Sequence, residues 1–311
     1  MIIDLPDTTV SQVAKQLVKV REEGGAVALG RVLTLVISAR NGVAEAAIDA
    51  ANDASREHPM RVIVVTTGEG EAHLDAQIRV GGDAGASEVV VLHAYGDAAS
   101  NEESLVTGLL LPDAPVVAWW PEEAPSNPAS SPLGRIAQRR ITDAATATDV
   151  RDRLALLGAE HAPGDTDLAW TRLTHWREQL AAVLDQPPYE PVTAVEVLGA
   201  AASPSTALLA AWLRLAFDVP VVWHYEDPEH WEAGIKSVRL TRASGDILLE
   251  RPETSVAVLT QPGQPDHELH LPRRTLRECL AEELRRLDAD LLYGRVITDG
   301  LEKLGLPEKT A

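Results

Sequence analysis

The 311-residue sequence has a single cysteine, Cys279, which excludes an internal disulfide and any metal site built from several cysteines. No apolar run approaches the roughly 20 residues that a membrane-spanning helix needs. The first residues, MIIDLPDTTVSQ, lack the basic region and apolar core of a signal peptide. We therefore expect a cytoplasmic protein.

Basic residues are also scarce, and the formal net charge is −19. A protein that binds the phosphate backbone normally presents a basic face, so this charge argues against nucleic acids and anionic membranes as partners. Phe, Tyr and Met are few, but seven Trp are present, and each of them is a large amount of surface to bury. An apolar fraction of 45% suffices for a core, and the length predicts about two domains.

The first half of the chain alternates apolar strands with helices. Continuous apolar runs predict a mainly parallel sheet with covered faces, and we place a first α/β domain at residues 1–150. Thr9 and Gln12 fit a capping box at the start of the first helix. We also expect a helix at EAHLDAQIRV, residues 71–80. The predicted strands are residues 31–37, 61–66, 87–93 and 115–119.

The second half predicts a mixed α/β domain at residues 165–311, joined to the first near residues 145–165. Its first strands flank a helix at 203–217, with Ser203 as N-cap and Pro204 in the first helical position. Ser-Gly, Arg-Pro and Pro-Gly turns between residues 235 and 271 predict an antiparallel meander. We expect further helices at 166–185 and 274–290.

Glycine-rich stretches give only weak signals for phosphate binding. Gly25 and Gly30 have P-loop spacing, but Arg31–Val32 stand where Lys and Ser or Thr belong. TTGEGEAH, residues 66–73, follows a strand and is expected to open a helix, although His73 occupies the third glycine position. An anion at that helix start stays open. GGDAGAS, residues 81–87, is expected to be a loop.

Metal ligands and nucleophiles are no better supported. His267 and His270 point to opposite faces if they lie in a strand, so they cannot share one ion. HYEDPEHWE, residues 224–232, is interpreted as a solvated acidic loop rather than a cation site. Cys279 lies on a leucine stripe and is expected in the core, and Asp165 and Asp167 occupy positions typical of helix caps. We therefore predict no catalytic residues, cofactor or metal.

The stretch APVVAWWPEEAPSNPASSPLGRIAQRRITD, residues 114–143, is the strongest candidate for function. Its two adjacent Trp should point to opposite faces of a strand, so at most one is expected in ordinary core. A helix capped at Ser131–Pro132 is expected to carry the three Arg, and on the helix at 166–185 Trp170 lies off the apolar stripe. Half-exposed Trp and Arg are typical of interface hot spots. The candidate partner-binding residues are Trp119, Trp120, Arg135, Arg139, Arg140, Trp170 and Arg172.

The same residues have a structural interpretation. The Trp could pack a domain junction, and the Arg could pair with the surplus carboxylates. From the residues alone the two interpretations carry equal weight.

Several long segments, among them REEGGAVALGRVLTLVI, LLLPDAPVVAWWP, PLGRIAQRRITDA, GDTDLAWTRLTHWR and DQPPYEPV, resemble one family. It is the family of glucose-6-phosphate dehydrogenase assembly proteins, or OpcA, in its actinobacterial form. The resemblance implies a non-catalytic partner that binds glucose-6-phosphate dehydrogenase and promotes its active oligomer, supporting the oxidative pentose phosphate pathway and NADPH production. It favours the interface interpretation.

Two alternatives stay open. One is an enzyme or sensor that binds a phosphorylated metabolite at the Ser131/Arg135 helix start, where a capped N-terminus and an Arg would favour an anion. The other is a scaffold with no effect on turnover. Thiol-based redox control of the kind described for cyanobacterial relatives would need more than Cys279.

Overall fold

A computed structural model describes residues 1–23, 31–40, 42–80, 88–200, 202–226, 234–253 and 255–305. Within them the chain forms two compact units, each with its own sheet. Unit 1 comprises Met1–Asp143, Gly164–Thr166 and Leu276–Ala289, and unit 2 comprises Ala144–Pro163, Asp167–Thr275 and Asp290–Ala311. The predicted α/β class with two separate sheets is confirmed.

The sheet of unit 1 has eight strands in the order β1-β4-β5-β3-β2-β6-β7-β8. Five neighbouring strands run parallel to one another: β5, β3, β2, β6 and β7. At one side of them, β4 pairs antiparallel with β5, and the edge strand β1 pairs antiparallel with β4. The four predicted strands are present. The strands are β1 (Ile2–Leu5), β2 (Leu33–Ser38), β3 (Met60–Gly68), β4 (His73–Arg79), β5 (Glu88–Tyr95), β6 (Val116–Trp119), β7 (Arg139–Thr142) and β8 (Asp165–Asp167).

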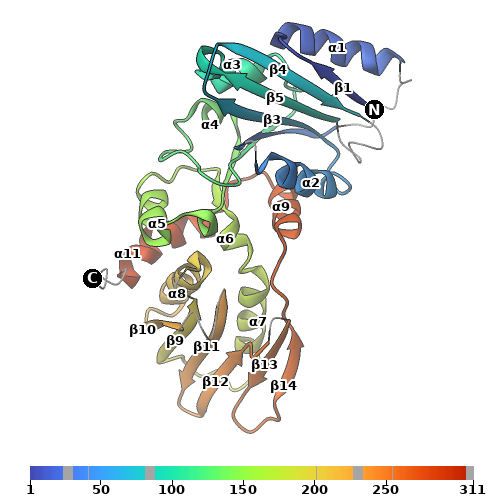
Figure 1. Cartoon of the computed structure of the whole chain (residues 1–311). Coiled ribbons are helices and arrows are strands. Elements are labelled where there is room, and N and C mark those ends of the chain that lie inside the picture. The colour runs from blue at the N-terminus through green and yellow to red at the C-terminus, as the bar shows by residue number, and fades with distance from the viewer. Residues whose placement is uncertain are drawn as a thin grey trace. The chain divides into compact units, whose positions relative to one another are not determined.

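Helices cover both faces of this sheet (Figure 1). Apolar residues of α1, α3 and α4 pack into one cluster with one face of the strands, and α2 packs against α9 and β3. The capping box of α1 is confirmed, because the Gln12 amide donates to Thr9 Oγ1 at 3.3 Å and Gln12 Oε1 accepts from the Thr9 amide at 2.9 Å. The helices are α1 (Val10–Glu23), α2 (Ala44–Ala54), η2 (Gly96–Ala99), α3 (Glu102–Thr107), α4 (Pro132–Ile136) and α9 (Leu276–Arg285).

Strand β4 corrects the helix predicted at residues 71–80. Its side chains are buried at every second position, at Leu74, Ala76 and Ile78. That period of two belongs to a strand with one covered face. The alternation of apolar and polar residues from His73 to Arg79 is visible in the sequence and favours a strand over a helix.

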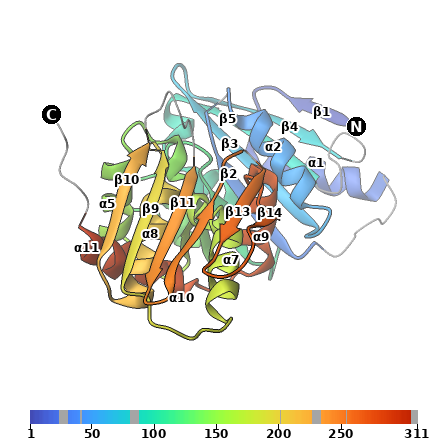
Figure 2. The ribbon, with the colours of Figure 1, turned by 90° about the horizontal axis from the view of Figure 1, so that it is seen from below.

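The sheet of unit 2 has six strands in the order β10-β9-β11-β12-β13-β14 (Figure 2). β9 and β10 are parallel and joined through α8, and the remaining pairs are antiparallel, which confirms the predicted meander. Burial alternates along β9, β11, β12 and β13, so one face packs into the core and the other is less covered. The strands are β9 (Ala194–Ala200), β10 (Val221–Glu226), β11 (Ile235–Arg242), β12 (Gly245–Glu250), β13 (Val256–Thr260) and β14 (His267–His270).

The helix predicted at 166–185 is broken into α6 and α7. Asp167 caps α6, its carboxylate accepting from the Ala169 amide at 2.9 Å, and α6 ends at Thr171 before α7 begins at Thr174. The helices and helical turns of unit 2 are η3 (Ala144–Thr146), α5 (Val150–Ala159), α6 (Leu168–Thr171), α7 (Thr174–Leu184), α8 (Pro204–Phe217), α10 (Leu291–Arg295), the π-helical η4 (Val296–Gly300) and α11 (Leu301–Leu304).

The two units are not consecutive stretches of chain. Residues 164–166 and 276–289 group with unit 1, although they follow residue 150 in the sequence. The predicted helix at 274–290 is the shorter α9 of unit 1. Whether residues 1–150 and 165–311 act as domains in their own right stays a prediction.

Candidate functional site

Both tryptophans of the 114–143 stretch are buried. Trp119 is 0% exposed and Trp120 is 2% exposed. They do point to opposite faces: Trp120 joins the apolar cluster under α1, and Trp119 lies in register with Ile37 and Ile141 on the other face. The expectation that one of them leaves the core is wrong, because helices cover both faces of this sheet.

The three arginines do not share a helix. α4 ends at Ile136, and Arg139 and Arg140 begin strand β7. Both are almost fully buried, at 4% and 7% exposure. The predicted Arg-bearing helix is therefore wrong, because the chain re-enters the sheet after one helical turn.

Arg139 and Arg140 each contact a carboxylate within unit 1. Arg139 Nε donates to Glu283 Oε2 at 3.1 Å, and its Nη1 donates to the Asp288 carbonyl at 2.6 Å. Arg140 Nε donates to Asp165, and its Nη1 donates to the Ala137 carbonyl at 3.0 Å. Asp165 is thus the partner of an arginine rather than a helix cap. These contacts make both arginines part of the fold's interior.

The Ser131/Arg135 helix start is satisfied by its own surroundings. Ser131 Oγ accepts from the Gly134 amide at 3.0 Å and donates to the Pro128 carbonyl at 2.7 Å. Arg135 pairs with Glu103 at 2.9 Å, and its side chain is 55% exposed. The helix has only five residues. The cap is confirmed, but the geometry gives no support to an anion site here.

Trp170 is also an interior residue, at 1% exposure. Its Nε1 donates to Asp290 Oδ2 at 2.9 Å, and the Arg177 guanidinium lies 3.8 Å from the ring centroid. Arg172 is half-buried at the turn between α6 and α7. Of the seven candidate contact residues, only Arg135 and Arg172 keep accessible side chains.

The glycine-rich candidates do not gain the context that phosphate binding needs. TTGEGEAH runs from the end of β3 into β4, so it joins two strands and opens no helix. Gly25, Gly30 and GGDAGAS lie outside the described residues. The anion site left open at residues 66–73 is therefore corrected to a strand connection.

The histidine pair and the cysteine lie where the sequence predicted them, in a strand and in the core. His267 and His270 lie in strand β14, and most of HYEDPEHWE lies outside the described residues. No group of three or more potential ligands gathers within the described part of the chain. Cys279 is a fully buried thiol in α9 and forms no disulfide. In the same described ranges, no helix has the length and apolar character needed to cross a bilayer.

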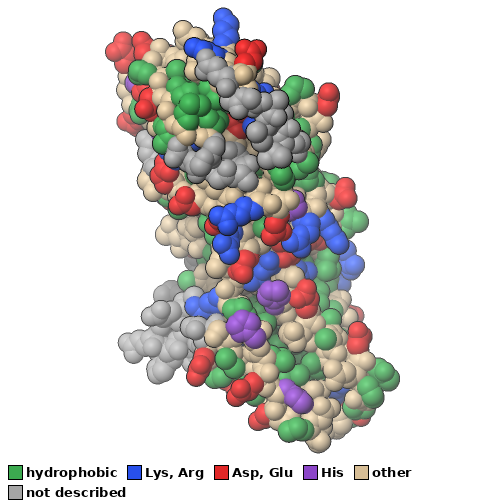
Figure 3. Space-filling model, turned by 90° about the vertical axis from the view of Figure 1, so that its right-hand side faces the viewer, with side chains coloured by type: hydrophobic (Ala, Val, Ile, Leu, Met, Phe, Trp, Pro, Cys, Tyr) green, Lys and Arg blue, Asp and Glu red, His purple; other side chains and the backbone are tan. Residues whose placement is uncertain are grey.

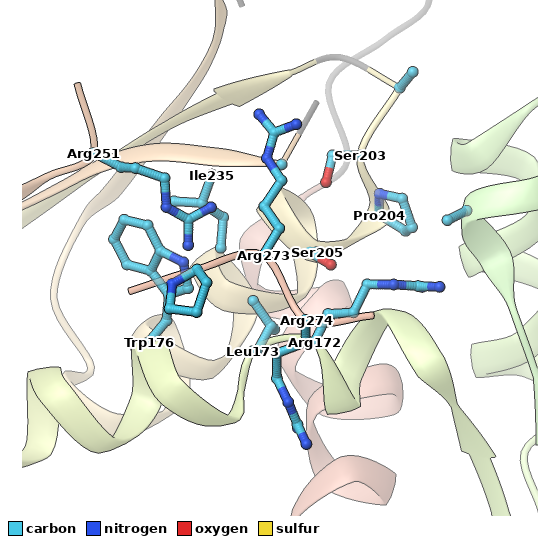
Figure 4. Close-up of a pocket in the computed structure, with 14 residues that line it drawn as sticks. Arg172, Leu173, Trp176, Ser203, Pro204, Ser205, Ile235, Arg251, Arg273 and Arg274 are labelled. Carbon is cyan, nitrogen blue, oxygen red and sulfur yellow. The ribbon is translucent and has the colours of Figure 1, made fainter. Parts of the chain in front are cut away.

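A cavity in unit 2 was not foreseen from the sequence. It measures about 430 Å³ and gathers side chains from the turn before α7, the start of α8, β11, the end of β12 and the segment before α9 (Figure 4). Adjacent Arg273 and Arg274 and the Ser-Pro-Ser helix start were its only local signals. The lining residues are Ala145, Arg172, Leu173, Trp176, Ala202, Ser203, Pro204, Ser205, Gly234, Ile235, Arg251, Pro272, Arg273 and Arg274.

Arg251 is the most buried cation of this cavity, at 3% exposure. Its guanidinium lies 5.0 Å from the centroid of the Trp176 ring, and Figure 4 shows the two side by side. Burial, with the charge of Arg273 added to it, lowers the pKa of Arg251 to about 10. At neutral pH the group is therefore still a cation, held where charge is disfavoured.

Surface residues provide a second group of candidates. On the face shown in Figure 3, Lys and Arg side chains gather in one region, although the chain's formal net charge is −19. Tyr189 and Leu291, both in unit 2, are 77% and 76% exposed. Tyr189 belongs to the segment DQPPYEPV, but nothing in the sequence pattern indicated its exposure.

Comparison with known proteins gives two family matches that together span most of the chain. The family model described as the glucose-6-phosphate dehydrogenase subunit N-terminal domain matches residues 51–159, and the corresponding C-terminal domain model matches residues 163–297. No curated protein sequence matches. An oxidoreductase structure from Sinorhizobium meliloti is 10% identical, with a TM-score of 0.46, and the match covers 88% of this chain and 94% of that one. An NAD binding oxidoreductase from Klebsiella pneumoniae is 9% identical, with a TM-score of 0.47 and coverages of 88% and 96%.

Proposed function

Because the chain belongs to the OpcA family of glucose-6-phosphate dehydrogenase assembly proteins, we propose that it is a non-catalytic factor that binds this dehydrogenase and favours its active oligomer. The observation that carries the proposal is the pair of family matches at residues 51–159 and 163–297. In this role the protein acts in the cytoplasm and supports the oxidative pentose phosphate pathway and its production of NADPH.

Local structure supports the non-catalytic part of the proposal. The one glycine-rich stretch that could have opened a dinucleotide-binding helix joins two strands instead. The two closely spaced histidines of β14 lie in an extended strand, and the single thiol is enclosed in the core. These positions, in strands and in the core, need no substrate to explain them.

The mechanism follows from the thermodynamics of linked equilibria. A partner promotes an active oligomer only if it binds that state more tightly than the inactive one, since equal affinity shifts nothing. A tenfold shift needs about 1.4 kcal/mol of differential binding. One or two accessible anchor residues can supply that amount.

The contact surface must use accessible side chains. Trp119, Trp120, Trp170, Arg139 and Arg140 are enclosed, so we place Arg135 and Tyr189 at the head of the candidates. Arg135 extends from α4, and Tyr189 follows α7. Both residue types are enriched at interface hot spots. Arg172 also stays a candidate.

The experiment measures the dehydrogenase of the same cell with and without this chain. Co-purification, the sedimentation profile of the dehydrogenase and its turnover should all respond to the added chain. Failure of the chain to change either the oligomer or the turnover of the dehydrogenase would overturn the proposal. Dehydrogenase activity in this chain alone would overturn its non-catalytic part.

Matched variants locate the surface. Arg135→Ala should weaken dehydrogenase binding, whereas Arg285→Ala should not. The Arg285 side chain has a similar exposure of 61% and a similar carboxylate contact, with Glu57 at 3.1 Å. Tyr189→Ala is compared in the same way with Leu291→Ala. Equal losses within each pair would show a general effect of surface charge or apolar area and would remove Arg135 and Tyr189 from the interface.

A further inference from the structure

The lining of the unit 2 cavity carries charge of one sign. Four arginines line it, Arg172, Arg251, Arg273 and Arg274, and no Asp or Glu occurs among the described residues that line it. In a chain with 19 more acidic than basic residues, such a gathering is unexpected.

Burial makes the positive charge of Arg251 energetically unfavourable. It is 3% exposed, and within the described ranges its Nε has no hydrogen-bond partner. Among the described residues its guanidinium contacts the face of Trp176 rather than a carboxylate. A desolvated cation without a counter-charge lowers the stability of a protein by several kcal/mol unless something else compensates it.

The start of α8 adds to the same field. This helix has 14 residues, and its first residues, Pro204 and Ser205, line the cavity. Ser203 is the N-cap residue but its side chain makes no capping hydrogen bond. Pro204 has no amide hydrogen and the Thr206 amide donates to the Ser203 carbonyl at 3.1 Å, so the helix start offers an anion the positive end of its dipole and the Ser205 amide.

We propose that this cavity binds a small phosphorylated molecule, with its phosphate held between Arg251, Arg273 and the start of α8. Guanidinium groups bind phosphate oxygens through paired hydrogen bonds, and an anion there would supply the counter-charge that no described residue provides to Arg251. Trp176, Leu173 and Ile235 form an apolar wall for the remainder of the ligand. A volume of about 430 Å³ lies within the usual range for small-molecule sites.

This inference goes beyond the proposed function, because it concerns a ligand of this chain alone. It also differs from the helix start at Ser131, whose hydroxyl and arginine already have partners. The test therefore uses the purified full-length chain without the dehydrogenase, so its result does not depend on whether the two proteins bind.

The experiment measures thermal unfolding and calorimetric binding at constant ionic strength. The probes are inorganic phosphate and glucose 6-phosphate, with glucose as an uncharged control and succinate as a carboxylate control. We expect saturable stabilisation by both phosphate compounds, greater for glucose 6-phosphate, and none by glucose. Stronger binding of succinate than of either phosphate compound would overturn the assignment to phosphate, and an absence of saturable binding would overturn the site.

Variants separate a ligand site from a structural charge. Arg251→Met and Arg273→Met should each weaken glucose 6-phosphate binding by about tenfold to a hundredfold, which is the usual effect of losing a charged hydrogen bond. Arg239→Met is the matched control, because Arg239 lies in the same unit but contacts Glu196 and Asp246 outside the cavity. Equal weakening by all three variants would show non-specific attraction and would refute the site.

The melting temperature without ligand shows separately how the substitution changes the stability of the fold. Without ligand, Arg251→Met should melt at a higher temperature than the natural chain, because it removes an uncompensated buried charge. A lower melting temperature together with unchanged phosphate binding would show that Arg251 serves the fold alone.

Discussion

Buried arginines have different surroundings in the two units. In unit 1, Arg61, Arg139 and Arg140 contact Glu88, Glu283 and Asp165, respectively. In unit 2, Arg242 donates to the Pro188 carbonyl, and the guanidinium of Arg251 lies over the Trp176 ring with no carboxylate contact among the described residues. In unit 1 the carboxylates neutralise the buried arginines, whereas in unit 2 the charge of Arg251 is left for a bound anion to neutralise. Burial of an arginine alone therefore says little about function, and the nature of its partner says more.

The two sheets differ in a related way. Where helices cover both faces, strands of unit 1 are buried along all or nearly all of their length, as in β6 and β2. The strands of unit 2 alternate between buried and half-buried positions. Adjacent tryptophans can both be core residues in the first kind of sheet. In the second kind, one of them would face outward.

The largest expected effect comes from breaking a charge pair in unit 1. Glu283→Ala leaves Arg139 buried without its carboxylate, and we expect the free energy of unfolding to fall by about 3–5 kcal/mol. Urea denaturation measures it. Arg139→Met combined with Glu283→Leu should recover most of the loss, because no charge then stays buried. A loss for Glu283→Ala close to zero would mean that this pair does not differ from a surface contact.

Cys279→Ser tests a neutral group on the same helix. The thiol is fully buried, and burying a more polar hydroxyl in its place should lower the free energy of unfolding by about 1–3 kcal/mol. Dehydrogenase binding, measured well below the melting temperature, should not change. Loss of binding with unchanged stability would show a functional thiol and would contradict its assignment to the core.

Arg251→Met should change the free energy of unfolding in the opposite direction. Removing the uncompensated charge should raise the free energy of unfolding by about 1 kcal/mol, the gain being reduced by the lost contact with Trp176. The pKa of Arg251 in the folded state is lowered to about 10, so above that pH the unfolded state binds more protons and the stability of the natural chain rises.

The difference between this variant and the natural chain should therefore be constant from about pH 6 to 9 and shrink above about pH 10. Urea denaturation across this range measures it. A variant less stable than the natural chain at pH 7 would remove the contrast between the two units.

The smallest effect is expected at an exposed pair. The hydrogen bond from Arg79 lowers the pKa of the Glu45 carboxyl, and the Glu45 side chain is 65% exposed. Glu45→Gln should cost less than about 1 kcal/mol at pH 7 because solvent screens the pair. A depressed carboxyl pKa stabilises the fold above its unfolded value, so the difference should vanish as the pH falls through the lowered pKa. A cost comparable to that of Glu283→Ala would contradict the role given to burial.

Local patterns predicted the parts of the fold that depend on neighbours in the sequence. The apolar runs of β2, β3, β5 and β6, the capping box at Thr9 and the turns of the meander all have signals within a few residues. The missed strand β4 had such a signal too, in the alternation of Leu74, Ala76 and Ile78.

The site residues depended on distant partners. Arg140 meets Asp165, 25 residues away, and Arg139 meets Glu283, 144 residues away, so no local pattern could show that they are enclosed. The cavity around Arg251 likewise draws on six separate segments. The two tryptophans are different, because continuous apolar strands already predicted covered faces and should have placed both in the core.

The chain changes unit at five places, after residues 143, 163, 166, 275 and 289. A fragment ending at residue 159, where the first family match ends, would keep Arg139 and Arg140 but lose Glu283 and Asp165. It would also lose α9, which packs on α2. A truncation or gene fusion near the middle of the chain would therefore separate Arg139 and Arg140 from their carboxylates in the interior of unit 1.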